Sequence, residues 1–459
     1  MCAVHSDTIV AHCTPHGAGA LAIIRISGEQ ACAIATRISR LPSDARITDV
    51  QTHTIHYGHI VDMHGNDVDQ VLFFVMHAPR TFTGEDTVEI SCHNNPSIIQ
   101  SIVTLAIVAG ARLAHAGEFT RWSVENGKMD LVQAESINDL INAGTQQSLK
   151  LSLAQLQGSL SCELALIEKK ILKAYALSEA SFEFIDEEDM QFGTQIALIM
   201  QEVMASIERL KKAHDMRQQI KEGARIALIG SVNAGKSSLF NALLGKDRAI
   251  VTAIAGTTRD VIEAGIYRNG SHMTLVDTAG LRATNDIIEH YGIERSYQEA
   301  QKADVILLVV DESRRMSARE KVIYEDLYRM YSSKIIVVGS KADLPALKSV
   351  DQALITCDIH VSTVTHTRVA DLESLMMAKL TALCAIAEMP FLINKRQLTL
   401  ILSFEVKIQE CIVLLKGDVP YEILSYTIQE ALSNFSELTG KTISESAMDA
   451  IFKEFCVGK

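Results

Sequence analysis

Gly230, Gly235, Lys236 and Ser237 have the spacing of a phosphate-binding loop, G-x-x-x-x-G-K-S. In such a loop, backbone amides face phosphate oxygens, the lysine amine reaches the outer phosphates, and the serine hydroxyl binds Mg²⁺. An apolar run at 226–229 precedes the loop, as a strand should. The alternative is a turn whose serine only caps a helix, and that alternative predicts none of the elements described next.

A second phosphate-side element is DTAG at 277–280, which follows the apolar run 273–276. Asp277 therefore lies at the end of a predicted strand, where its carboxylate can reach Mg²⁺ through water. Gly280 is expected near the terminal phosphate. The two elements together predict a nucleoside triphosphatase that needs Mg²⁺.

The purine base of the bound nucleotide is predicted from residues 340–343, Ser-Lys-Ala-Asp. This segment follows a buried strand at 335–338. Guanine-binding GTPases carry Asn-Lys-x-Asp at this place. The carboxylate of Asp343 can accept hydrogen bonds from N1–H and the exocyclic amine of guanine, a donor pair that adenine lacks. Ser340 replaces the usual asparagine, so we expect lower affinity with the guanine preference retained.

Composition limits the class of protein. The chain has 459 residues, is 47% hydrophobic and has a net charge of −13, so it is long enough for several domains and is not suited to broad electrostatic binding of nucleic acid. Its nine cysteines include no CxxC pair, which indicates reduced thiols. No run is long enough for a membrane span and no secretion signal is evident, so we expect a cytoplasmic protein without membrane contact.

Periodicity divides the chain into four segments. Residues 1–122 alternate short β-branched runs with one helical stretch, 123–218 have the period of long packed helices, 219–384 hold the nucleotide motifs, and 385–459 return to helical periodicity. The predicted fold class is a multidomain protein with an α+β N-terminal domain, a discontinuous helical domain and an inserted α/β phosphate-loop G domain. Bundle packing alone accounts for the apolar stripe between 149 and 174.

Several longer stretches resemble the MnmE family, also called TrmE, of tRNA-modifying GTPases, and the similarity extends from residue 7 to residue 459. The stretches are DTIVAHCTPHGAGALAIIRISG at 7–28, TFTGEDTVEI at 81–90, GEFTRWSVENGKMDLVQAES at 117–136, GTTRD at 256–260 and the terminal CVGK. The departures are Ser340, VSTVTHT near 361, NKRQ at 394 and the alanines of PHGAGALA. None of them removes a predicted phosphate or Mg²⁺ ligand.

The resemblance implies an N-terminal domain that forms a homodimer and binds a 5-formyl-tetrahydrofolate-type one-carbon donor. Its folate contacts correspond here to Arg25, Glu85, Lys128 and Lys459, and its C-terminal cysteine to Cys456, with a catalytic role. Taken alone, the two cations could be solvated surface charges, and the cysteine a small packing residue. The N-terminal region could also be a dimerisation scaffold without a ligand.

Hydrolysis needs a residue that positions water, because Leu281 occupies the place of the Ras-type glutamine. The resemblance assigns this role to Glu289. It also implies a K⁺ ion held by Asn233, Thr252, Ile254 and Thr257, which would stabilise charge as an arginine does, and Mg²⁺ held by Ser237 and Thr258. The expected GTP-binding residues are Asn233, Ala234, Gly235, Lys236, Ser237, Ser238, Thr252, Ala253, Ile254, Ala255, Gly256, Thr257, Thr258, Asp277, Thr278, Ala279, Gly280, Ser340, Lys341, Ala342, Asp343, Ser362 and Thr363.

The function expected from the resemblance is a K⁺-stimulated GTPase that acts on tRNA. With an FAD- and NADH-using partner of the MnmG type, it would add a carboxymethylaminomethyl-type group to C5 of the wobble uridine. Two alternatives remain: a ribosome-assembly GTPase of the Era or Der type, and a folate-dependent aminomethyltransferase with a regulatory G domain. The first leaves TGED, NGKMD and CVGK unexplained, and the second predicts one-carbon transfer without the flavin protein.

Overall fold

The computed structural model describes residues 7–42, 45–183, 192–215, 224–245, 262–268, 271–277, 297–345, 356–384, 391–417 and 420–458. The chain divides into two compact units, one of residues 1–138, 155–206 and 399–459, the other of 139–154 and 207–398. Among the described residues, no helix has both the length and the apolar character that a membrane crossing requires.

The first unit contains a seven-stranded sheet in the order β3-β4-β5-β6-β2-β1-β7, in which every neighbouring pair is antiparallel except β1 and β7. Alternate strand residues point into a core that the helices α1 and α2 cover. The elements are β1 (Ile9–His12), β2 (Leu21–Ser27), α1 (Ala31–Arg37), β3 (Ser39–Arg40), the 3₁₀ turn η1 (Ile47–Asp49), β4 (Thr54–Val61), β5 (Asp67–Met76), β6 (Thr87–His93), α2 (Pro96–Val108) and β7 (Arg112–Leu113).

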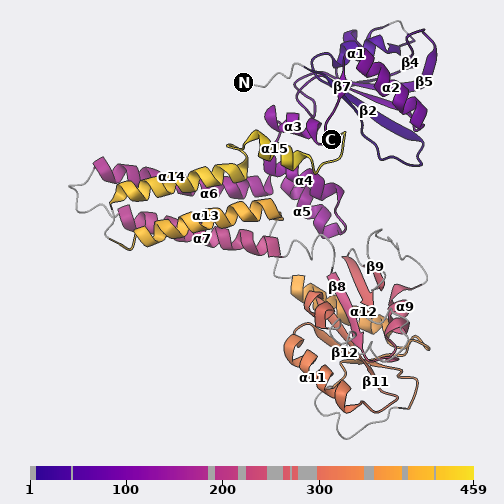
Figure 1. Cartoon of the computed structure of the whole chain (residues 1–459), viewed down its shortest axis with the longest axis vertical. Coiled ribbons are helices and arrows are strands. Elements are labelled where there is room, and N and C mark those ends of the chain that lie inside the picture. The colour runs from indigo at the N-terminus through magenta and orange to yellow at the C-terminus, as the bar shows by residue number, and fades with distance from the viewer. Residues whose placement is uncertain are drawn as a thin grey trace. The chain divides into compact units, whose positions relative to one another are not determined.

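Figure 1 shows α6, α7, α13 and α14 side by side in one bundle, to which chain segments before and after the second sheet each contribute two helices. Before the second sheet come α3 (Glu118–Glu125), α4 (Leu131–Ile141), α5 (Gln146–Leu156), α6 (Ser159–Glu183) and α7 (Phe192–Asp215); after it come α13 (Lys395–Leu414), α14 (Tyr421–Thr439) and α15 (Glu445–Phe452). Helix α14 packs along α6, and its Phe435 ring lies 5.0 Å from the ring of Phe404 on α13. The helical domain is therefore discontinuous in sequence.

The second unit contains a six-stranded sheet in the order β13-β12-β11-β8-β10-β9, parallel except for the pair β9 and β10. Helices α9 and α12 cover one face and α11 covers the other. The elements are β8 (Ala224–Gly230), α9 (Lys236–Leu244), β9 (Ile262–Arg268), β10 (Ser271–Asp277), β11 (Val305–Asp311), α11 (Ala318–Tyr331), β12 (Ile335–Ser340), β13 (Ile359–His360) and α12 (Val369–Cys384).

The predicted fold class is confirmed: an α+β region, helices on both sides of an insertion, and an α/β domain with its loop between β8 and α9. β11 and β12 are buried along their whole length, as central parallel strands between two helical layers must be. The domain limits at 122, 218 and 384 remain predictions.

Candidate functional site

The loop between β8 and α9 has the backbone of a phosphate cradle. Asn233 has φ 63° and Gly235, which caps α9, has φ 94°, a left-handed conformation that favours glycine. Gly230 is required for a different reason, because a Cβ atom there would lie 2.5 Å from the carbonyl oxygen of Val309 on the neighbouring strand. The amides at the start of α9 thus lie at a helix N-terminus, where anions bind.

Lys236 lies inside this loop and is only 5% exposed. Its Nζ donates to the carbonyl oxygens of Gly230 at 2.7 Å and Ser231 at 2.6 Å. Burial lowers the pKa of Lys236, and nearby Asp277 acts in the opposite direction. A buried ammonium group held by neutral carbonyls is suited to receive phosphate oxygens, which would supply the missing negative charge.

The two predicted Mg²⁺-side oxygens meet directly. Parallel pairing places Asp277, the last residue of β10, beside Leu228 of β8. There its Oδ2 accepts a hydrogen bond from Ser237 Oγ at 2.8 Å. A hydroxyl and a carboxylate beside a phosphate loop are the oxygen ligands that Mg²⁺ prefers, so these residues fit the ion.

Ser340 joins the base side of the site to the phosphate loop. Its side chain is buried, and its Oγ lies 2.6 Å from the carbonyl oxygen of Ala234 and 3.1 Å from that of Val310. The hydroxyl therefore makes the loop-to-loop contact, even though it replaces an amide.

Two side-chain contacts hold the rest of the predicted guanine loop. Lys341, at φ 60°, places its Nζ 2.7 Å from Asp311 Oδ2. Asp343 Oδ1 accepts from Ser362 Oγ at 2.6 Å, which connects the loop to the predicted second guanine segment at 362–363. Burial raises the pKa of Asp311, but hydrogen bonds from Lys341 and Ser313 outweigh it and hold the pKa below its usual range.

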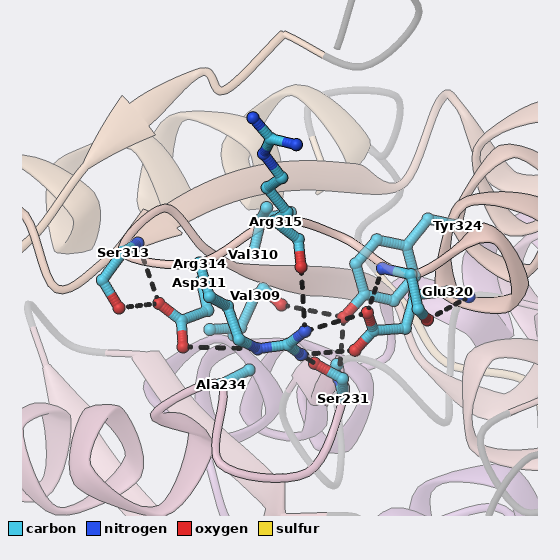
Figure 2. A network of polar contacts seen from close by, with 12 residues as sticks. Ser231, Ala234, Val309, Val310, Asp311, Ser313, Arg314, Arg315, Glu320 and Tyr324 are labelled. Atoms are coloured by element: carbon cyan, nitrogen blue, oxygen red, sulfur yellow. Dashed lines mark hydrogen bonds and ion pairs between the residues drawn. The ribbon is translucent and has the colours of Figure 1, made fainter. Parts of the chain in front are cut away.

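A polar network missed by the sequence analysis supports the loop from the α11 side (Figure 2). Ser231 N donates to Tyr324 Oη at 2.7 Å, and that hydroxyl donates to the Val309 carbonyl at 3.2 Å. Arg314 Nη2 reaches Ser231 Oγ at 2.9 Å while the same guanidinium pairs with Glu320. This pairing lowers the pKa of Glu320 to about 2. The only sequence signal was Ser317-x-x-Glu320, a capping box at the start of α11.

In the N-terminal domain, Arg25 is not a solvated surface charge. Its side chain is 20% exposed, pairs with Glu89 at 2.7 Å, and lies over the rings of Phe82 and Phe119. Its Nη1 also lies 3.5 Å from the Gly458 carbonyl, so the C-terminal segment reaches this arginine.

The C-terminal segment is held beside the start of α3. Ala116 and Val457 form an antiparallel bridge, and Gly117 N donates to the carbonyl of Cys456 at 3.3 Å. The Cys456 side chain is exposed. A reactive role is thus sterically open to it, and the packing alternative does not fit this exposure.

Glu85 and Lys128, the other two predicted folate contacts that the structure describes, are each held by a hydrogen bond. Asn126 Nδ2 donates to Glu85 Oε1 at 3.1 Å, and Lys128 Nζ donates to the Pro79 carbonyl at 2.6 Å. Asn126 Oδ1 is buried and has no hydrogen-bond partner within the part of the chain that the structure describes. A carboxylate beside an unpaired buried acceptor fits the N–H groups of a folate ring, so these residues are consistent with the expected cofactor.

Comparison with known proteins identifies the family. A family model described as "GTP-binding protein TrmE N-terminus" matches residues 8–128, and one described as "MnmE helical domain" matches residues 131–456. The tRNA modification GTPase MnmE of Bacillus pumilus (strain SAFR-032) is 36% identical over 461 residues, covering 99% of this chain and 100% of that protein. This chain belongs to the MnmE family. The MnmE of Bacillus subtilis (strain 168) is 35% identical over the same share of both chains.

The family prediction made from the sequence is confirmed by these matches. Among solved structures, the G domain of the T. maritima FeoB iron transporter is 26% identical over 34% of this chain and 98% of its own, with a TM-score of 0.27.

Part of the MnmE-type site lies outside the described residues. These positions are Thr252, Ala253, Ile254, Ala255, Gly256, Thr257, Thr258, Thr278, Ala279, Gly280, Leu281, Glu289 and Lys459. The expected K⁺ site is therefore represented by Asn233 alone, whose side chain is exposed at the loop. Ser238 and Thr363 lie within the described residues, and their role in binding GTP stays a prediction.

Proposed function

We propose that this chain hydrolyses GTP with Mg²⁺ and K⁺ and uses the reaction to modify tRNA. With an MnmG-type FAD protein and a formyl-tetrahydrofolate-type donor, a homodimer joined through the N-terminal domain would add a carboxymethylaminomethyl-type group to C5 of the wobble uridine. The observation that carries the proposal is the phosphate loop itself: Lys236 lies within it, Ser237 contacts Asp277, and Ser340 joins the loop to the segment that carries Asp343.

Each of these residues has a distinct part in the proposed hydrolysis. The Lys236 ammonium would neutralise phosphate charge. Ser237 and Thr258 would hold Mg²⁺, with Asp277 reaching the ion through water, and the ion when bound offsets charge on the phosphate oxygens. Asn233 would contribute to a K⁺ site, and Glu289 would orient water. Asp343 would select guanine.

Base selection is tested by Asp343→Asn. The amide can donate to the carbonyl oxygen that xanthine has where guanine has an amine, so turnover of GTP should fall and turnover of XTP should rise. Asp371→Asn, on the exposed start of α12, is the matched control and should change neither. If the unaltered protein neither binds GDP nor hydrolyses GTP, the proposal fails.

The cation is tested by measuring hydrolysis in K⁺ and in Na⁺ at equal ionic strength. A fixed monovalent cation beside the oxygen that bridges the β- and γ-phosphates of GTP would stabilise the charge that develops as the bond to the γ-phosphate breaks. The rate should therefore be much higher in K⁺. Equal rates would remove K⁺ from the proposal but would leave GTP hydrolysis standing.

The tRNA reaction is tested in cells that lack this protein. Mass spectrometry of their wobble uridines should show loss of the C5 substituent. In a reconstituted reaction on tRNA from these cells, the purified chain should restore the substituent only together with the flavin protein. Restoration without the flavin protein would favour the aminomethyltransferase alternative. An unchanged uridine profile would favour a ribosome-assembly GTPase.

A further inference from the structure

Three side chains of metal-binding type meet in the N-terminal sheet domain. Cys32 lies in the first turn of α1, His77 directly follows β5, and Asp86 directly precedes β6. β5 and β6 are antiparallel, with Met76 opposite Thr87, so the next residue of one strand and the preceding residue of the other face each other. Helix α1 packs on this end of the sheet and brings Cys32 to them.

Hydrogen bonding fixes the orientation and tautomer of the histidine. His77 Nε2 lies 3.2 Å from the carbonyl oxygen of Val50, which can only accept, so Nε2 carries the proton in the neutral ring. The lone pair is then on Nδ1, which lies 3.7 Å from Cys32 Sγ and 3.7 Å from Asp86 Oδ1. Histidines that bind metal typically donate their other ring N–H to a carbonyl or carboxylate oxygen, which sets the tautomer in this way.

We propose that Cys32 Sγ, His77 Nδ1 and Asp86 Oδ1 form a site for a divalent zinc-type cation, with water completing the coordination. Zinc lies about 2.3 Å from sulfur and about 2.0 to 2.1 Å from nitrogen or oxygen, so ligand atoms around a tetrahedral ion are roughly 3.3 to 3.6 Å apart. The distances of 3.7 Å from His77 Nδ1 to Cys32 Sγ and to Asp86 Oδ1 exceed this range only slightly, and the three ligand atoms all lie within 4.8 Å of one another.

Charge and access also suit such an ion. A thiolate and a carboxylate together carry two negative charges, which would neutralise a divalent cation beside the apolar core. Cys32 is 5% exposed, whereas the side chains of His77 and Asp86 are each 29% exposed. The buried thiol thus closes the site on the core side, and the other two ligands leave a route from solvent.

Metal binding must displace the proton of the thiol. Burial, together with the charge of Asp86 and a hydrogen bond to it, raises the pKa of Cys32 to about 12. In the metal-free protein the thiol is therefore protonated, and each bound ion forms a sulfur–metal bond and releases one proton to solvent. Among the described residues, His77 and Asp86 are the ionisable side chains that face the thiol. Because each bound ion releases the thiol proton, the affinity for the metal should rise as the pH is raised.

The test uses the full-length protein and Co²⁺ as a spectroscopic probe. Titration should give a thiolate-to-cobalt charge-transfer band together with the strong visible bands of tetrahedral cobalt, at one ion per chain, and Zn²⁺ should displace both. Asp86→Asn removes the ligand charge but keeps an oxygen that can accept from Ala78 N, as Asp86 Oδ1 does at 2.8 Å. It should weaken binding by at least about tenfold, and Cys32→Ser should abolish the charge-transfer band.

Cys357→Ser is the matched control, because Glu312, Cys357 and His360 form a second cluster of similar composition in the α/β domain. The proposal predicts that the band survives Cys357→Ser. A band that disappears in Cys357→Ser and persists in Cys32→Ser would overturn it, as would the absence of any band in the unaltered protein. Circular dichroism checks that Cys32→Ser is folded, and Asp86→Asn provides the decisive comparison if it is not.

Discussion

At the scale of single residues, the phosphate loop depends on a hydroxyl that lies outside every nucleotide motif. Tyr324 is 4% exposed and uses its hydroxyl twice, accepting from Ser231 N and donating to the Val309 carbonyl. It therefore joins the first turn of the loop to the strand beside it. We regard Tyr324 as a positioning residue, because it acts on the nucleotide only through Ser231.

Tyr324→Phe should weaken GDP binding by about tenfold. The ring still fills its place, but Ser231 N–H loses its acceptor, and an unpaired amide costs about 1 to 3 kcal/mol. Isothermal titration calorimetry measures the effect. Tyr328→Phe, on an exposed part of the same helix, is the control. Equal affinities in both variants and the unaltered chain would show that the hydroxyl does not position the loop.

Ser340→Asn should tighten GDP binding, since an amide keeps a donor for the Ala234 carbonyl and adds a second polar group toward the base. Ser340→Ala should loosen it because the contact between the two loops is lost. Calorimetry on the pair gives the order of affinities. An asparagine variant that binds no more tightly than serine, while remaining folded, would contradict the expectation of lowered affinity in this chain.

Residues within short motifs could be predicted from the sequence, and partners distant in sequence could not. Lys236, Ser237 and Asp343 each follow a buried strand at a diagnostic spacing. Tyr324 and the Arg314–Glu320 pair carry no such spacing, because the contact of Arg314 with Ser231 spans 83 positions and depends on how α11 packs on the sheet. The pairing of Arg25 with Glu89 was missed for the same reason, since it requires the register of β2 and β6.

At the scale of elements, the parallel pairing of β8 with β11 positions the loop. Val309 lies opposite Gly230, so the strand passes within van der Waals distance of the glycine where the loop begins. The apolar runs 226–229 and 335–338 made β8 and β12 predictable, whereas the order of strands in the sheet was not. The close approach at Gly230 follows from that order.

Gly230→Ala should therefore damage the sheet and the loop together. The added methyl would lie 2.5 Å from the Val309 carbonyl, so the strands must separate, at a cost of about 1 to 3 kcal/mol. Thermal unfolding should show a lowered transition, and GDP should bind more weakly. A variant with unchanged melting and affinity would mean that the backbone relaxes without cost.

At the scale of the molecule, the last residues of the chain complete the N-terminal domain. Gly458 has φ 94°, and a Cβ atom there would lie 2.8 Å from the backbone of Cys13, so the tail fits closely against the loop after β1. Its carbonyl reaches Arg25. Sequence positions at opposite ends of the chain thus share one site.

Deletion of 456–459 should reduce binding of a reduced formyl-folate by at least about tenfold, because Arg25 loses the tail that closes over it. GTP hydrolysis by the phosphate-loop domain should be unchanged. Fluorescence titration and phosphate release measure the two activities. Cys456→Ser is the control and should keep folate affinity while testing the proposed chemical role. Full folate affinity in the truncated chain would separate the tail from the cofactor.

The pairing of α6 with α14 has a consequence for biosynthesis. Ser425 hydrogen-bonds Glu179 across a separation of 246 positions. A ribosome that has just released α6 must translate the whole inserted domain before the partner helix emerges. The apolar residues of α6 that pack against α14 therefore stay exposed during that interval, and α14 completes the bundle only late in translation. Premature termination anywhere in the insertion should yield a chain whose first sheet is folded but whose helices attract chaperones.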